Sequence, residues 1–129
     1  MIVLGIESSC DETAVAIVKD GRKILANIVA SSLKLHSKHG GVVPEIASRA
    51  QLESIAGVFS RAIKAAGIKE ERIDLVSVTC GPGLPGSLLV GISFAKALAL
   101  SLDKPILGVN HIHSHIYANL LCHKNIKMP

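Results

Sequence analysis

Three short aliphatic runs precede any helical pattern in this sequence, and this order constrains the fold more than any other feature. The runs occupy residues 2–6, 13–18 and 23–31. A polar connector over residues 7–12 is short enough for a hairpin, and Asp20-Gly21 is a strong turn signal between the second and third runs. The sequence therefore predicts three consecutive antiparallel strands at the start of the chain.

After a polar loop over residues 33–43, the chain alternates helical and strand patterns. Pro44 suits the first turn of a helix, and Gly67 ends the helical spacing of apolar residues. The predicted elements are helix 44–66, strand 75–80, helix 87–102, strand 105–109 and helix 111–122. Strands joined through helices are parallel neighbours. We expect an α/β fold, a mixed five-stranded sheet with helices on both faces, which is the layout of the ribonuclease H-like lobe of actin-like ATPases and sugar kinases.

Composition limits the function classes. The chain has 129 residues, 49% of them hydrophobic and 19% charged, which suits one domain or one lobe of a larger enzyme. Aromatic residues make up only 2%, and this nearly excludes a stacking platform for single-stranded nucleic acid. The net charge of +4 fits an ordinary solvated surface. The alternative is that the basic residues between positions 19 and 39 contact a phosphate backbone.

Cysteine usage and hydropathy point to a compartment. Cys10, Cys80 and Cys122 are odd in number and widely spaced, which indicates a reducing environment and no disulfide framework. We expect these thiols in the core rather than as nucleophiles. The first residues have no basic leader, unlike a signal peptide, and the apolar stretch 88–102 is too short and too polar to span a bilayer. A cytoplasmic protein without a membrane partner is expected.

The connector between the first two strands carries acids. Glu7, Asp11 and Glu12 lie there beside small hydroxyl residues. A tight hairpin presents backbone N–H groups and hydroxyls to a phosphate, and carboxylates hold a cation on it. The alternative is a plain polar hairpin, in which Ser, Asp and Thr are common residues.

A histidine cluster follows the last predicted strand. His111 and His115 are four residues apart, so both lie on one helical face, the spacing by which one helix supplies two metal ligands. His113 points elsewhere, and His123 is poorly placed. Ile112 stands where the metallopeptidase motif has its general base, a Glu. Two imidazoles make an incomplete site that needs a ligand from elsewhere; a chance surface pair is the alternative.

Residues 81–86 match the pattern Gly-x-Gly-x-x-Gly between a strand and a helix. A dinucleotide site also needs an acid at the end of the next strand, about 20 residues on. Asp103 lies before that strand instead. A structural or substrate-lining turn is therefore the favoured interpretation of this glycine-rich segment.

Four segments together resemble the tRNA N6-adenosine threonylcarbamoyltransferase family, once labelled O-sialoglycoprotein endopeptidase. They are Gly-Ile-Glu-Ser-Ser-Cys-Asp-Glu-Thr at 5–13, Gly-Gly-Val-Val-Pro-Glu-Ile-Ala-Ser-Arg at 40–49, Gly-Pro-Gly-Leu-Pro-Gly-Ser-Leu at 81–88 and Asn-His-Ile-His-Ser-His at 110–115. The resemblance runs from residue 2 to about residue 121. The form of the first segment is similar to the bacterial and organellar branch.

This resemblance implies transfer of a threonylcarbamoyl group from threonylcarbamoyl-adenylate to the adenosine next to the tRNA anticodon. It implies a divalent metal ion, iron or zinc, held by His111, His115 and an Asp of a second lobe. It places Asp11 and Glu12 near the adenylate as candidate catalytic residues. The family usually has a Glu between the two histidines, where this chain has Ile112-His113-Ser114.

The resemblance further implies two actin-like lobes, of which residues 1–129 form the first, so the fragment alone is expected to be inactive. The implied partners are tRNA, an inactive paralogue subunit and a small P-loop ATPase. Helix 87–102 is apolar nearly all round and carries a stripe of small residues, Gly91, Ala95 and Ala99, that would admit another helix. We expect helices 44–66 and 87–102 to dock on the paralogue, or on a second copy when the paralogue is absent. Burial under the second lobe is the alternative for these helices, and a non-catalytic scaffold or a metallopeptidase is the alternative for the function.

Overall fold

The computed structural model describes residues 1–32 and 40–123, and in them the predicted order of elements is confirmed. The elements are β1 (Ile2–Glu7), β2 (Glu12–Lys19), β3 (Lys23–Ser31), α2 (Pro44–Ala66), the 3-10 turn η2 (Glu70–Arg72), β4 (Leu75–Gly81), α3 (Pro85–Leu102), β5 (Ile106–Asn110) and α4 (His111–Cys122). Most of the predicted loop 33–43 lies outside the described residues. Gly67, at φ 64°, ends α2 as predicted.

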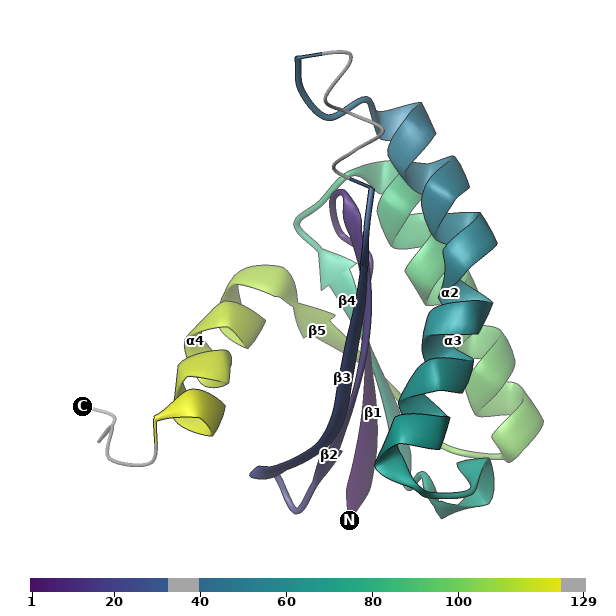
Figure 1. The fold of residues 1–129 in the computed structure, drawn as a ribbon, viewed down its shortest axis with the longest axis vertical. Coiled ribbons are helices and arrows are strands. Elements are labelled where there is room, and N and C mark those ends of the chain that lie inside the picture. Colours follow the sequence, from purple (N-terminus) through teal and green to yellow (C-terminus); the bar gives the residue numbers. More distant parts are fainter. Residues whose placement is uncertain (33–39, 124–129) are drawn as a thin grey trace.

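The five strands form one mixed sheet in the order β3-β2-β1-β4-β5. β1 pairs antiparallel with β2 and parallel with β4, and β5 adds to β4 in parallel. Helices α2 and α3 lie side by side on one face, whereas α4 leans away on the other face (Figure 1). The expected ribonuclease H-like arrangement, with helices on both faces, is therefore present.

Alternation along the strands assigns each side chain to a face. Ile2, Leu4 and Ile6 of β1 are buried and belong to the aliphatic core under α2 and α3. Successive strand residues point to opposite sides, so the odd-numbered residues of β1, ending at Glu7, face α4. The polar end of β1 thereby reaches the side of the sheet that the core does not use.

The small-residue stripe of α3 is covered within the chain, where α2 lies beside α3, and docking of a partner on these helices stays a prediction. An added Cβ at Gly91 would lie 2.3 Å from Ser8 Oγ, so Gly91 packs on the end of β1 and not on a second helix. Ala95 and Ala99 are buried within the core of the chain itself. Helical spacing shows which residues share a face, but only the folded chain shows what covers it. The exposed leucines on α2 and α3 are Leu52, Leu89 and Leu100.

The prediction that the apolar stretch 88–102 is too short and too polar to span a bilayer also needs correction. By length and composition alone, the 18 residues Pro85–Leu102 are long and apolar enough to cross a bilayer. The core helix of a soluble protein meets the same criterion, and α3 places 28% of its residues inside this domain. Its buried residues pack with the sheet and with α2.

Candidate functional site

The carboxyl ends of the three parallel strands meet at one edge of the sheet. Glu7 ends β1, Thr79 lies near the end of β4, and His111 directly follows β5. Ligand sites of open α/β sheets form at this edge, outside the carboxyl ends of the strands. Residues that are 72 and 104 positions apart in sequence thus become direct neighbours.

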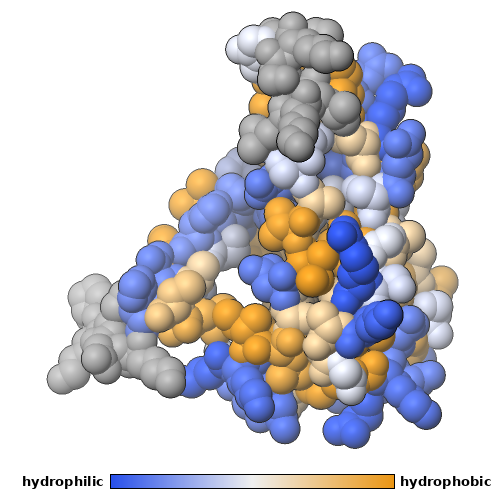
Figure 2. Space-filling view, in the orientation of Figure 1, coloured by the Kyte–Doolittle hydropathy of each residue, from blue (hydrophilic) through white to orange (hydrophobic). Residues whose placement is uncertain are grey.

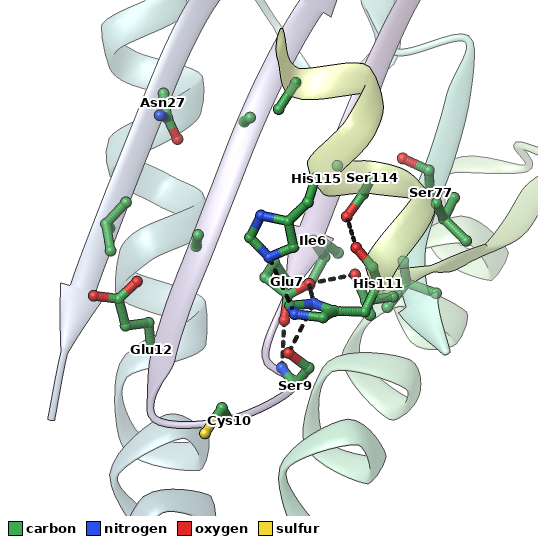
Figure 3. Close-up of a pocket in the computed structure, with 18 of the residues that line it drawn as sticks. Ile6, Glu7, Ser9, Cys10, Glu12, Asn27, Ser77, His111, Ser114 and His115 are labelled. Carbon is green, nitrogen blue, oxygen red and sulfur yellow. Dashed lines mark hydrogen bonds and ion pairs between the residues drawn. The ribbon is translucent and has the colours of Figure 1, made fainter. Parts of the chain in front are cut away.

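The start of α4 brings the two predicted histidine ligands together. Asn110 caps the helix, because its Oδ1 accepts hydrogen bonds from the N–H groups of Ile112 at 2.9 Å and His113 at 3.2 Å. One turn of helix then places His111 and His115 on the same face, with their Nε2 atoms 3.1 Å apart. Figure 3 shows both rings directed into the same space above the end of β1.

The side chain of Glu7 joins the strand ends. Its Oε1 accepts the Ser9 N–H at 2.5 Å, and its Oε2 accepts the Thr79 hydroxyl at 2.5 Å. The same Oε2 lies 3.3 Å from Nδ1 of His111, which also contacts Ser9 Oγ at 3.1 Å. Burial alone would raise the pKa of Glu7, but the hydrogen bonds from Ser9, Thr79 and His111 together lower it below its ordinary value. Glu7 is therefore an ionised acceptor at neutral pH.

The hairpin that carries Asp11 and Glu12 is held from behind by α2 and α3. The Nε2 group of Gln51, a fully buried residue of α2, lies within 3.0–3.3 Å of the carbonyl oxygens of Ser8, Cys10 and Glu12. Ser87 of α3 donates its hydroxyl to the Cys10 carbonyl at 3.0 Å. These donors satisfy the carbonyl groups on the protein side of the hairpin, so its acidic side chains are free to face the cavity.

The glycine-rich turn after β4 supports the same hairpin. The N–H of Leu84 donates to the Ser9 carbonyl at 2.8 Å, and a Cβ on Gly83 would lie 2.6 Å from that oxygen. The space that a dinucleotide motif offers to a pyrophosphate is filled here by the chain's own Ser9. The structural interpretation of residues 81–86 is confirmed.

All four predicted site residues border one cavity of about 650 Å³ between α4 and the sheet. Asp11, Glu12, His111 and His115 line it, and so does Glu7. Figure 2 shows the hollow between α4 and the body of the molecule, with hydrophobic side chains beside it. Glu12 lies on the side of β2 and β3, apart from the histidines (Figure 3). The cavity therefore has Glu12 on one side and the two histidines, with Glu7 beside His111, on the other.

The histidine pair fits part of a metal site. A tetrahedral ion with Zn–N distances of about 2.0–2.1 Å separates two ligand nitrogens by roughly 3.3 Å, close to the 3.1 Å between the Nε2 atoms. In residues 1–32 and 40–123, no group of three or more His, Cys, Asp or Glu side chains is placed to hold an ion. His113 is exposed and does not line the cavity. The pair supplies two ligands, and any further ligand must come from elsewhere.

The cysteine prediction is wrong in one respect. Cys10, Cys80 and Cys122 are all exposed rather than buried in the core. Cys10 lies in the hairpin, Cys80 at the end of β4 and Cys122 at the end of α4, where the core does not reach. Although Cys10 is exposed, partial desolvation of its thiol and the neighbouring Asp11 raise its pKa, which keeps the thiol protonated and weakly nucleophilic at neutral pH.

Sequence reasoning missed the roles of Glu7, Ser9 and Thr79 around His111. Glu7 stood out only as one of three hairpin acids. The available signal was positional, because a polar residue that ends one parallel strand meets polar residues that end its neighbours.

Comparisons with known proteins match the chain to one family. The family model for tRNA N6-adenosine threonylcarbamoyltransferase matches residues 23–129. The enzyme of that name from Syntrophomonas wolfei is 57% identical over 128 residues, which is 99% of this chain and 38% of the relative. The one from Thermosipho africanus is 59% identical over 129 residues, 100% of this chain and 39% of the relative. The chain thus spans 38–39% of the length of these relatives.

Two solved structures share the fold at low sequence identity. YeaZ from Pseudomonas aeruginosa superposes with a TM-score of 0.63 at 20% identity, covering 84% of this chain and 43% of the other. T. thermophilus RuvC in complex with Holliday junction substrate gives a TM-score of 0.60 at 12% identity, covering 100% and 83%. These likenesses support the ribonuclease H-like architecture.

Proposed function

Because the chain belongs to the tRNA N6-adenosine threonylcarbamoyltransferase family, we propose that it contributes one half of a site that transfers threonylcarbamoyl from threonylcarbamoyl-adenylate to tRNA. The acceptor is the amine of the adenosine next to the anticodon. The observation that carries this proposal is the convergence of Asp11, Glu12, His111 and His115 on one cavity. Those four residues are the ones that the family resemblance implies for the site.

The chemistry assigns distinct work to each side of the cavity. His111 and His115 would hold a divalent ion, iron or zinc, and when bound this ion would supply positive charge as a Lewis acid. On the other side, Asp11 and Glu12 lie near the adenylate. One of these carboxylates accepts the proton that the adenosine amine loses as its nitrogen bonds to the carbamoyl carbon. The bond to AMP breaks, and AMP leaves as the anion.

Residues 1–129 are proposed to be the first lobe of a two-lobe enzyme. The curated relatives are longer, and the histidine pair is short of a complete ligand set in the part of the chain described. The lobe alone is therefore expected not to modify tRNA. Modified nucleoside produced by purified 1–129 with its partners and threonylcarbamoyl-adenylate would refute this statement.

Mass spectrometry of tRNA nucleosides provides the test of function. Deleting the gene should remove threonylcarbamoyladenosine, and full-length protein should restore it. Asp11→Asn and His111→Ala should fail to restore it, whereas His113→Ala, changed outside the cavity, should succeed. Restoration by all three variants would favour a non-catalytic scaffold similar to the inactive paralogue. If the deletion strain keeps the nucleoside but loses a peptidase activity, the protein is a metallopeptidase. Ile112, which stands where that motif has its general base, argues against this function.

The expected partners are tRNA, an inactive paralogue and a small P-loop ATPase, in the cytoplasm and away from membranes. Leu52 on α2 and Leu89 and Leu100 on α3 are exposed on the helices proposed to dock. A test of this docking must avoid Ala95, which is fully buried, because a charge there would disrupt the core. Sedimentation of Leu89→Glu is suitable. A wild-type dimer that this change dissociates supports docking through α3, and an unchanged dimer places the interface elsewhere.

A further inference from the structure

We propose that Glu7 is a positioning residue that fixes the ring of His111 and directs its Nε2 atom into the cavity as a metal ligand. This inference rests on the proposed role of His111 and His115 in holding a metal ion. It concerns a carboxylate that contacts the imidazole of His111. Glu7 acts through the imidazole and is a separate element of the site from the hairpin acids.

The carboxylate is itself held in place at both oxygens. The Ser9 N–H donates to Oε1, and the Thr79 hydroxyl donates to Oε2. These donors come from the hairpin after β1 and from β4, so the carboxylate is fixed by two elements besides its own strand. A carboxylate with its rotation restricted in this way is a rigid reference point for a third group.

That third group is Nδ1 of His111, which lies 3.3 Å from Oε2 of Glu7 and 3.1 Å from Ser9 Oγ. Both oxygens of Glu7 already accept hydrogen bonds, from Ser9 and Thr79, so the carboxylate is an acceptor toward Nδ1 as well. We therefore assign the proton of His111 to Nδ1 and the lone pair to Nε2. Metal-bound histidines almost always donate their second ring N–H to a carboxylate, a carbonyl or water. The pair formed by Glu7 and His111 has that arrangement before any ion is considered.

The two histidines are supported unequally. Within residues 1–32 and 40–123, the ring of His115 makes its hydrogen bond to Nε2 of His111 and contacts no carboxylate. Its ring is therefore oriented by His111, which is in turn oriented by Glu7 (Figure 3). This hierarchy predicts that disturbing Glu7 affects both ligands, although it contacts one of them.

Metal affinity of the full-length protein provides the test. Competition between the protein and a chromophoric chelator for Zn²⁺ should show that Glu7→Gln weakens binding 10–100-fold, the usual effect of losing such a partner. Glu53→Gln removes the same charge from an exposed position of α2 that does not line the cavity, so its affinity should equal that of the wild type. Thr79→Val, which frees one side of the Glu7 carboxylate, should weaken binding less than Glu7→Gln does.

The outcomes separate this inference from the proposed function. Wild-type affinity in Glu7→Gln, with binding lost in His111→Ala, would overturn the role of Glu7 and leave the metal site in place. Wild-type affinity in His111→Ala and His115→Ala would overturn the metal site itself. If Glu7→Gln does not fold, nitrogen NMR of the metal-free wild type decides. Protonation of His111 at Nδ1 supports the inference, and protonation at Nε2 refutes it.

Discussion

Replacing a helical glycine with alanine should stabilise the fold at Gly57 and destabilise it at Gly91. Gly57 in α2 is exposed, and an added Cβ there would meet nothing within 4 Å. Gly57→Ala should therefore stabilise the fold by about 1 kcal/mol, the difference in helix propensity between the two residues. Gly91 in α3 gains the same propensity, but its new Cβ would lie 2.3 Å from Ser8 Oγ and 3.3 Å from Ser8 Cβ.

The loss of stability in Gly91→Ala follows from the burial and the hydrogen bond of Ser8. Ser8 is buried, and its hydroxyl donates to the Ser87 carbonyl at 2.8 Å. Rotating the hydroxyl away leaves a buried polar group without its partner, at about 1–3 kcal/mol. Crowding against Ser8 Cβ adds about 1–3 kcal/mol. After the gain of about 1 kcal/mol in propensity, Gly91→Ala should destabilise the chain by roughly 1–5 kcal/mol.

Urea denaturation followed by far-ultraviolet circular dichroism measures both effects. The midpoint should rise for Gly57→Ala and fall for Gly91→Ala, with similar m-values. In a Ser8→Ala background the cost of Gly91→Ala should shrink, because the clashing oxygen is gone. A Gly91→Ala variant as stable as Gly57→Ala would show that α3 does not approach the end of β1 as closely as described.

Three further predictions concern the site and the chain start. His111→Ala and His115→Ala should each abolish retention of metal by the full-length protein while His113→Ala keeps most of it, as measured by elemental analysis after dialysis. Gln51→Met should cost about 1–3 kcal/mol by removing the donor behind the hairpin, and it should speed amide hydrogen exchange there. The Met1 amine lowers the pKa of Asp20, so this pair stabilises the fold above the ordinary carboxyl pKa and ceases to do so as pH falls through the lowered value. Acetylating the amine should return the pKa of Asp20 to normal in an NMR titration.

The order of elements was predictable because local sequence patterns determine it. The aliphatic runs of β1 and β2, the Asp20-Gly21 turn and the helical spacing between Pro44 and Gly67 are each local features of the sequence, and the structure contains the elements that they predict. The pairing of His111 with His115 was predictable for the same reason, since one helical turn fixes it.

The surroundings of His111 were not predictable from such patterns. Its contact with Glu7 depends on β1 lying beside β4 and on β4 lying beside β5, which is a property of the whole sheet. The burial of Gly91 depends likewise on which element covers its helix face. Cysteines are usually buried, but Cys10 belongs to a hairpin tip, where position outweighs residue type.

The central place of β1 in the sheet sets an order of events during synthesis. Its partner β2 follows within a few residues, whereas its other partner β4 begins only at Leu75. Leu75, which pairs with Val3, is therefore synthesised 72 residues later. Until then one edge of an aliphatic strand is open, a template for pairing with other chains. The N-terminal meander is thus the part of the nascent chain that most needs protection, and α2, which is made before β4, can cover only its face.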